Sequence, residues 1–210
     1  MSKLSDSQKT LLDTAVTIFQ DRLAVDPAAQ EYLDGRGFDP ALADTFRLGV
    51  VPHDPPAGFE QYTGRLAIPY LTPTGVVDVR FRSLGGDSPK YMSRPGTAGR
   101  IYNVGAFQRG GSFLAVCEGE IDAMTADGMA GIPCVGIPGA NGWKPLWARA
   151  FQDYDTVFVL CDGDDPGREF GKRVRKDVEN AVVVHLPEGT DVNSIVTSQG
   201  VDALREKVGL

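Results

Sequence analysis

The feature that most constrains this chain is a repeated alternation of short apolar runs and helical segments in its second half. The apolar runs are residues 113–117, 133–137, 156–161 and 181–186. Runs of this kind are typical of strands that are buried on both faces, as in parallel sheets. The helical segments between them are residues 121–130, 144–152 and 166–179. This alternation predicts a four-stranded parallel sheet flanked by helices, with the strands in the spatial order second, first, third, fourth.

The first half opens with helical patterns. Two Asp-Pro pairs, at 26–27 and 39–40, indicate helix starts, because Asp accepts hydrogen bonds from free backbone N–H groups and Pro suits the first helical position. We therefore expect short helices at 27–34 and 40–46. An amphipathic helix is expected before them, from the apolar stripe Leu12, Ala15, Val16, Phe19 and Leu23.

Strand patterns follow, and a glycine-bearing stretch then divides the chain. Alternating residues predict strands at 65–70 and 75–82, a loop at 83–100 and a short strand at 101–104. The division at 108–112 predicts a mixed α+β subdomain at 1–110 and an α/β domain at 111–210. The fold class is therefore α/β overall.

Composition excludes several other classes of protein. No apolar run approaches the roughly 20 residues that span a bilayer, and the N-terminus has no long apolar signal core. Three cysteines without C-x-x-C spacing and two histidines argue against a structural zinc site. We expect no membrane partner.

Basic residues concentrate in one stretch of an otherwise acidic chain. The net charge is −7, yet residues 61–110 hold seven basic and only two acidic residues. Arg80 and Arg82 alternate with apolar neighbours, so we expect them together on an exposed polar strand face. Replacing Arg82 or Lys90 with alanine should change stability little. The stretch fits either a local polyanion site or a merely solvated surface. Its candidate nucleotide- or DNA-binding residues are Arg65, Arg80, Arg82, Lys90 and Arg100.

Acidic residues follow the ends of the predicted strands. Glu118 comes directly after the first strand, Asp162 and Asp164 after the third, and Asp191 after the fourth, while Asp122 lies one helical turn beyond Glu118. Sites in open parallel sheets form beyond the carboxyl ends of the strands, where strand order reverses. We therefore expect these carboxylates to converge, with Glu118 and Asp162 a few ångströms apart.

Crowded carboxylates repel one another unless a cation neutralises them, and hard oxygen ligands select Mg²⁺ or Mn²⁺. Such ions can activate an attacking hydroxyl and stabilise a leaving pyrophosphate. The structural alternative is that Asp164 or Asp165 caps the following helix and that Glu120 is exposed. Cys117 and Cys161 end buried strands, which favours packing over catalysis. The predicted metal ligands are Glu118, Asp122, Asp162, Asp164 and Asp191.

These motifs resemble the Toprim domain shared by bacterial-type DNA primases, topoisomerases and some nucleases. The segment EGEIDAM resembles the primase block E-G-Y-M-D-V, and LCDGDDPGREFGKR resembles F-D-G-D-x-A-G-x-x-A. The segment LPEGTDVNSIVTSQG resembles a third block, with Asn193 where the family has a second Asp. In the first half, YLDGRGFDPALADTFRLGVVP, RLAIPYLTPTGVVDVRFR and SPKYMSRPGT resemble further blocks of the primase core. The likeness covers about residues 29–200.

The resemblance implies a minimal primase catalytic core of phage or plasmid type, without the zinc-ribbon and helicase-binding domains. It implies a nucleotidyltransferase, a DNA-dependent RNA polymerase that makes short RNA primers on single-stranded DNA from nucleoside triphosphates. Glu118, Asp162 and Asp164 would be catalytic and Mg²⁺ or Mn²⁺ the cofactor, while Arg65, Arg82 and Lys90 would track template or nucleotide.

A replicative helicase or a separate zinc-ribbon template-recognition protein is the implied partner. The implied location is cytoplasmic, in the host cytoplasm if the protein is phage-encoded. Two alternatives stay open: a Toprim metal-dependent nuclease, and a non-catalytic replication module that binds single-stranded nucleic acid.

Overall fold

The computed structural model describes residues 4–109, 111–139 and 142–210, in two compact units, Met1–Ala98 and Gly99–Leu210. This division falls before the predicted boundary between residues 110 and 111, and residue 110 itself lies outside the described residues. The reason is that residues before the boundary pack with the second unit. Tyr102 pairs with Gly136, and Ala106 is part of the second unit's core.

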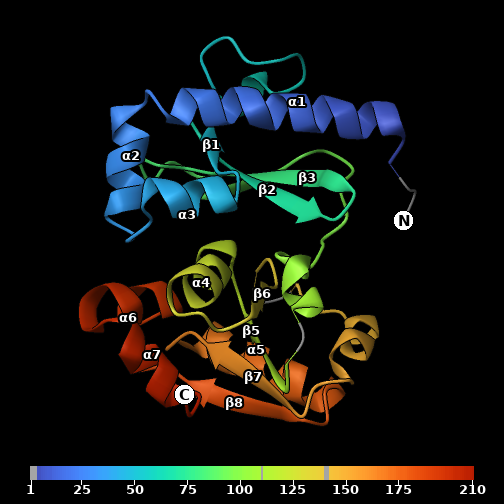
Figure 1. Ribbon diagram of the computed structural model, residues 1–210, viewed down its shortest axis with the longest axis vertical. Helices are drawn as coiled ribbons and strands as arrows, with labels where there is room; N and C mark the ends of the chain where they lie inside the picture. Colours follow the sequence, from blue (N-terminus) through green and yellow to red (C-terminus); the bar gives the residue numbers. More distant parts are fainter. Residues whose placement is uncertain (1–3, 110, 140–141) are drawn as a thin grey trace. The chain divides into compact units, whose positions relative to one another are not determined.

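The first unit is a four-stranded antiparallel sheet, in the order β1-β2-β3-β4, with helix α1 packed on it (Figure 1). Phe19 of α1 meets the rings of Phe59 and Phe81 edge-on, which fixes the helix over the sheet. The helices are α1 (Asp6–Leu23), α2 (Pro27–Asp34), α3 (Pro40–Thr45) and the 3₁₀ turn η1 (Glu60–Tyr62). The strands are β1 (Gly49–Val50), β2 (Leu66–Thr72), β3 (Gly75–Arg82) and β4 (Tyr91–Ser93).

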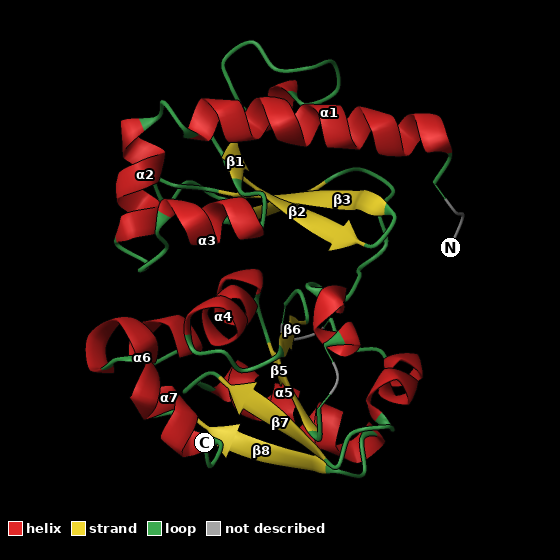
Figure 2. Cartoon of the chain, in the orientation of Figure 1, coloured by secondary structure: helices red, strands yellow, loops and turns green. Residues whose placement is uncertain are grey.

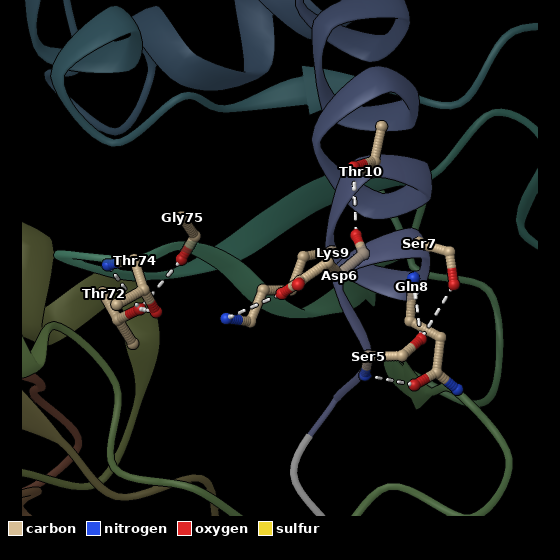
Figure 3. A network of polar contacts seen from close by, with 9 residues as sticks. All are labelled: Ser5, Asp6, Ser7, Gln8, Lys9, Thr10, Thr72, Thr74 and Gly75. Carbon is tan, nitrogen blue, oxygen red and sulfur yellow. Dashed lines mark hydrogen bonds and ion pairs between the residues drawn. The ribbon is translucent and has the colours of Figure 1, made fainter.

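Local hydrogen bonds explain where these elements begin. Ser5 and Gln8 form a reciprocal capping box at the start of α1 (Figure 3). Asp26 and Asp39 cap α2 and α3, which confirms the two predicted helix starts. At the β2–β3 turn, the Thr72 hydroxyl bonds to backbone groups of the turn, which closes it (Figure 3).

The second unit contains the predicted parallel sheet. Its order is β6-β5-β7-β8 with every pair parallel, so the expected order of second, first, third and fourth strand is confirmed. Helix α5 and the 3₁₀ turn η4 contribute to the core on one face of the sheet. The strands are β5 (Phe113–Cys117), β6 (Cys134–Gly136), β7 (Thr156–Cys161) and β8 (Ala181–His185). The helices are η2 (Val104–Gln108), α4 (Glu120–Met124), the π-helical turn η3 (Thr125–Met129), η4 (Pro145–Phe151), α5 (Asp165–Asp177), α6 (Val192–Gln199) and α7 (Val201–Lys207), and Figure 2 shows them around the sheet.

Several expected elements take another form. The predicted strand at 101–104 is a single bridge at Tyr102, and the predicted loop at 83–100 contains β4. The predicted helix at 121–130 widens into the π-turn η3, and the one at 144–152 is the tighter turn η4. In η4 the Trp147 N–H bonds to the Lys144 carbonyl three residues back, and Trp147 packs on the core. None of the helices in the described part of the chain is long and apolar enough to cross a membrane.

Candidate acidic catalytic site

The candidate site begins at the carboxyl ends of two neighbouring strands in the middle of the parallel sheet. Strand β5 ends at Cys117 and β7 at Cys161, so Glu118 and Asp162 are the first residues beyond each strand. The two strands pair in parallel, so their ends meet at the same sheet edge. The backbone of Asp162 lies near enough to the Glu118 carboxylate to lower the pKa of that group. The fold therefore brings these two acids into contact.

Glycines make the close approach of this loop possible. A Cβ at Gly163 would lie 1.8 Å from the Pro187 carbonyl oxygen, and a Cβ at Gly167 would lie 2.3 Å from the Asp162 carbonyl oxygen. Both distances are far shorter than any real Cβ contact. The two glycines of the D-G-D-D-P-G sequence are therefore required by packing, since only glycine fits at these two places.

The electrostatic environment makes both acids reluctant to ionise. Burial, together with the charges of Asp164 and Asp122, raises the pKa of Glu118 from 4.5 to about 7, against the opposing backbone hydrogen bond from Asp162. Burial first, and then the neighbouring carboxylates, raise the pKa of Asp162 from 3.8 to about 8. Asp191 is one of these neighbours, so the ends of three strands contribute charge to one place. A bound cation would relieve this repulsion.

Each of the two acids has one buried oxygen atom without a hydrogen bond. Glu118 Oε1 and Asp162 Oδ1 are both buried and accept no hydrogen bond from any residue that the structure describes. A buried acceptor that receives no hydrogen bond lowers the stability of the fold unless another group, such as a cation, satisfies it. These two atoms are therefore the places where a bound cation or hydroxyl would find open acceptors.

Two other predicted ligands are also helix caps. Asp164 Oδ1 accepts from the Gly167 N–H at 2.8 Å and begins α5, as the structural alternative expected. Asp191 Oδ1 accepts from the Ser194 N–H at 2.7 Å and begins α6, in a capping box. Each cap occupies one carboxylate oxygen and fixes the side chain at the helix start. Helix formation thus orients these acids before any ligand binds.

Asp122 is held by a buried network that includes Asn193. The backbone N–H of Asn193 donates to Asp122 Oδ1 at 3.0 Å, and the Asn193 side-chain amide donates to Thr125 Oγ1 at 2.9 Å. Thr125 in turn donates to the Ile121 carbonyl. The Asn193 amide is thus engaged with the π-turn, and the residue is 2% exposed.

The donor set fits a hard divalent cation, although the ligands are not assembled into a finished centre. No group of three or more His, Cys, Asp or Glu side chains within the described ranges is arranged to hold a metal ion. The chemistry nevertheless matches Mg²⁺ or Mn²⁺, which bind through a few carboxylates and complete their shell with water and phosphate oxygens. The open oxygens of Glu118 and Asp162 support this fit. Asp164 and Asp191 would use the carboxylate oxygen that does not cap a helix.

Glu120 and the three cysteines are buried in the second compact unit. The expectation that Glu120 is exposed is wrong, since it is 1% exposed in the first turn of α4 and interacts electrostatically with Tyr102. Cys117, Cys134 and Cys161 are free and buried. Burial raises the pKa of Cys161 to about 12, so its thiol stays protonated at neutral pH.

Two of the predicted basic residues meet at one aromatic ring in the first unit. The guanidinium groups of Arg80 and Arg82 lie 4.7 Å and 5.0 Å from the centre of the Tyr91 ring. Arg82 also hydrogen-bonds the Tyr91 hydroxyl and lies 5.8 Å from the centre of the Tyr32 ring. The expectation that Arg82 is exposed is wrong, since it is 6% exposed. Its packing between two tyrosines removes it from water.

The remaining basic candidates are held in different ways. Arg65 donates to the Pro89 carbonyl at 2.8 Å. Lys90 is exposed, and its carbonyl accepts from the Ser83 N–H at 2.9 Å. Its backbone therefore extends the β3–β4 ladder into the stretch that was expected to be a loop. Arg100 belongs to the second compact unit, and the other four belong to the first.

Sequence patterns missed several contributors. Arg173 of α5 lowers the pKa of Glu118. The sequence could have indicated it, because it is a basic residue on the helix that follows the D-G-D-D-P-G loop. Tyr91 and Tyr32 supply the rings under the arginines, and a tyrosine interleaved with basic residues was a usable signal. Thr125 had no local signal, because its role depends on a contact with Asn193, 68 residues away.

Comparison with known proteins agrees with this geometry. Residues 115–196 match a family model described as Toprim-like. The chain therefore contains a Toprim-like region and has the fold of a primase catalytic core. Within that class, the chain belongs to the family of the gene 57 protein of Mycobacterium phage D29, to which it is 49% identical over 152 residues, covering 70% of this chain and 99% of that protein.

More distant relatives are cellular primases. The chain is 25% identical to a DNA primase of Pseudomonas putida, over 94% of this chain but only 37% of that protein. A solved DNA primase domain from Pseudomonas aeruginosa has a TM-score of 0.81 at 24% identity, covering 95% of this chain and 77% of that chain. A DnaG primase catalytic domain bound to single-stranded DNA has a TM-score of 0.79 at 20% identity, with 95% and 77% covered. The shared fold extends over both compact units of this chain.

Proposed function

We propose that this chain is a primase-type nucleotidyltransferase core that synthesises short RNA primers on single-stranded DNA with the help of Mg²⁺ or Mn²⁺. The chain is similar to a DNA primase of Pseudomonas putida, and a DnaG primase catalytic domain of similar fold has been solved with single-stranded DNA bound. A replicative helicase or a separate zinc-ribbon template-recognition protein would be its partner. It would act in the cytoplasm, which is the host cytoplasm if the protein is phage-encoded. The chain spans well under half of the Pseudomonas primase, so the full range of primase activities does not transfer to it directly.

The observation that carries the proposal is the pair of open carboxylate oxygens on Glu118 and Asp162, at adjoining strand ends of a primase-type fold. A purely structural pair of acids would be expected to find donors inside the protein. Here burial and crowding raise the pKa of both groups instead. Such an arrangement is typical of functional sites.

Each acid can be given a role from its surroundings. Glu118, with a pKa of about 7, can accept the proton of a primer 3′-hydroxyl at neutral pH. Asp162, Asp164 and Asp191 would hold the cation, and Asp122, fixed by the Asn193 N–H, would support them. When bound, the cation would supply Lewis-acid stabilisation of the developing charge and of the pyrophosphate.

The basic residues of the first unit would bind the polyanionic substrate. Lys90 is exposed, and Arg80 is half-buried against the Tyr91 ring. Tyrosine rings and guanidinium groups together suit single-stranded nucleic acid, which they contact by stacking and by charge. Arg65 belongs to this set, and Arg100 would add to it from the second unit. Arg82 is buried, so it would hold the Tyr91 ring in place and would not itself contact the substrate.

The test incubates the protein with single-stranded DNA, labelled ribonucleotides and either cation. New short RNA is expected from the wild type, and Asp162→Asn should reduce synthesis by about three orders of magnitude or more, since it removes a cation ligand. Asp165→Asn is the matched control, because Asp165 lies in the same loop but is exposed and ion-paired with Arg168. It should retain synthesis.

The other outcomes separate the alternatives. Shortened DNA without new RNA would identify a Toprim nuclease. Binding of single-stranded DNA with neither reaction would identify a non-catalytic replication module. Equal synthesis by Asp162→Asn and wild type would show that the acidic site does not take part in RNA synthesis.

A further inference from the structure

A concave groove lies within the first compact unit, among its three helices. It has a volume of about 730 Å³ and is lined by the end of α1, by α2, by α3 and by Leu48. This volume falls in the range of pockets that bury a ligand of substantial size. All of its lining residues lie between Gln20 and Leu48, so it involves no residue of the acidic site.

The floor of the groove is apolar. The floor residues are Leu23, Leu33, Phe38, Ala43 and Leu48, each less than 9% exposed. Exposed Ala24, Pro27 and Pro40 extend the apolar lining toward solvent. Covering a concave apolar surface of this kind with another apolar surface lowers the free energy, because both are removed from water.

The rim of the groove is acidic. Glu31 and Asp34 line it from α2, and Asp39 and Asp44 from α3, while none of the lining residues is Lys or Arg. Asp39 caps α3, and Asp44 accepts from the Gln20 side chain at 3.2 Å. No ion pair to any of the four carboxylates occurs within the described residues. The groove therefore presents an apolar surface with carboxylates on its rim that form no direct ion pair. Arg47 bonds Gln20 beside Asp44, so Glu31, Asp34 and Asp39 are the carboxylates farther from a guanidinium contact of this kind.

The geometry points to this groove as the docking site of a basic amphipathic helix from a partner protein. Charge complementarity selects this occupant, since the acidic rim repels nucleic acid and nucleotides but attracts Lys and Arg. The apolar floor would take side chains at i and i+3 or i+4 of the helix, and basic residues beside them would meet the rim. This inference concerns the first unit alone and does not depend on the proposed catalytic function.

The test uses a fluorescent synthetic peptide of about 18 residues, with leucines at helical spacing and lysines elsewhere. A second peptide of identical pattern carries glutamate in place of lysine. Fluorescence anisotropy should show binding of the lysine peptide and much weaker binding of the glutamate peptide. Backbone amide chemical shifts of the bound protein should change at the groove residues.

Two variants and their controls locate the binding. Glu31→Lys with Asp34→Lys, both exposed, should weaken binding at least about tenfold, which is the loss expected for removing two complementary charges. Asp202→Lys with Glu206→Lys makes the same charge change on α7 and should alter binding less than about twofold. Ala24→Trp should block the groove, while Val25→Trp, its exposed neighbour outside the lining, should not.

Four results would overturn the proposal. These are no binding of the lysine peptide, equal binding of the glutamate peptide, equal losses from the groove and control reversals, or unchanged binding by Ala24→Trp. Sedimentation of the protein without peptide tests whether the groove is instead occupied by a second copy of the chain. If wild type self-associates and Ala24→Trp does not, a second copy of this chain occupies the groove and a partner helix does not.

Discussion

Each compact unit holds an ionisable side chain at the end of a sheet strand, but the two are surrounded very differently. Arg82 is the last residue of β3, and tyrosine rings and a tyrosine hydroxyl surround its guanidinium. Asp162 is the first residue beyond β7, and its closest electrostatic neighbours are four other carboxylates. Arg82 has aromatic and hydroxyl partners inside its unit, although its Nε has no hydrogen-bond partner among the described residues. The neighbours of Asp162 are groups of its own sign.

The difference shows what each region contributes. Cation–π contacts with aromatic faces partly offset the lost hydration of a buried cation, so Arg82 contributes to the stability of the first unit. A buried carboxylate among carboxylates lowers stability until a cation arrives. The surroundings of Arg82 therefore favour packing and those of Asp162 favour binding of a cation, and substitutions of these two residues should change stability with opposite signs.

The largest expected effect comes from breaking the acidic loop without changing its charge. Gly163→Ala places a methyl group against the Pro187 carbonyl oxygen, where the available distance is 1.8 Å. The backbone must move, so we expect a loss of about 4 kcal/mol or more in the free energy of unfolding, measured by urea denaturation. Gly105→Ala is the control, because no atom lies within 4 Å of its built Cβ. Equal stability of the two variants would show that the loop is not tightly closed.

The next effect tests the surroundings of Arg82. Arg82→Ala removes the buried guanidinium from the two tyrosine rings and leaves the Tyr91 hydroxyl without this donor. We expect a loss of about 2–4 kcal/mol in the free energy of unfolding, from lost packing and lost charge contacts. Lys90→Ala, at an exposed side chain nearby, should change stability by about 0.5 kcal/mol or less. An equally small loss at Arg82 would mean that its burial contributes nothing.

Much of the second unit's organisation follows from local sequence. Apolar runs fix β5 and β7, because strands buried on both faces need apolar residues throughout, and strand–helix alternation fixes the parallel order. Asp-Pro pairs likewise mark the starts of α2 and α3, since capping is a local interaction. The placement of Glu118 and Asp162 beyond adjacent strands follows from that order.

What sequence could not supply depends on contacts between distant residues. The Asp191 cap and the buried Glu120 were not predicted, because neither a helix starting at residue 192 nor the packing near Tyr102 has a clear local pattern. Arg82 follows a polar alternation that predicts exposure, yet Tyr91 of the neighbouring strand covers it. Burial of a polar residue is decided by what packs on it, which a single strand's pattern does not contain.

A smaller effect, of opposite sign to Arg82→Ala, tests the surroundings of Asp162. The pKa of Asp162 rises from 3.8 in the unfolded chain to about 8 in the fold. The folded state therefore keeps a proton that the unfolded state has released, and the free energy of unfolding should fall as pH rises from 4 toward 8 in the presence of EDTA. Glu118, raised from 4.5 to about 7, acts in the same direction.

Asp162→Asn should remove part of this dependence. At pH 8 we expect the variant to be more stable than wild type by about 1–2 kcal/mol, with partial solvent screening taken into account. Added Mg²⁺ or Mn²⁺ should stabilise wild type more than the variant, because binding to the folded state adds stability by mass action. Urea denaturation at several pH values gives both quantities, and Asp165→Asn should follow wild type. A wild-type stability that rises with pH over this range would contradict the assigned repulsion.

The smallest effect concerns Asn193, which replaces one acid of the Toprim pattern with a neutral donor. Asn193→Asp exchanges the amide that donates to Thr125 Oγ1 for a carboxylate close to Asp122. We expect the apo protein to lose about 1 kcal/mol in the free energy of unfolding, from one lost hydrogen bond and one added repulsion. Divalent cation should then stabilise Asn193→Asp more than it stabilises wild type, because the site has gained a carboxylate. Thr125→Val is the control, since it breaks the same hydrogen bond without adding charge and should leave the cation response unchanged. If both variants lose stability equally and respond equally to the cation, Asn193 contributes only a hydrogen bond and the charge of the site does not depend on it.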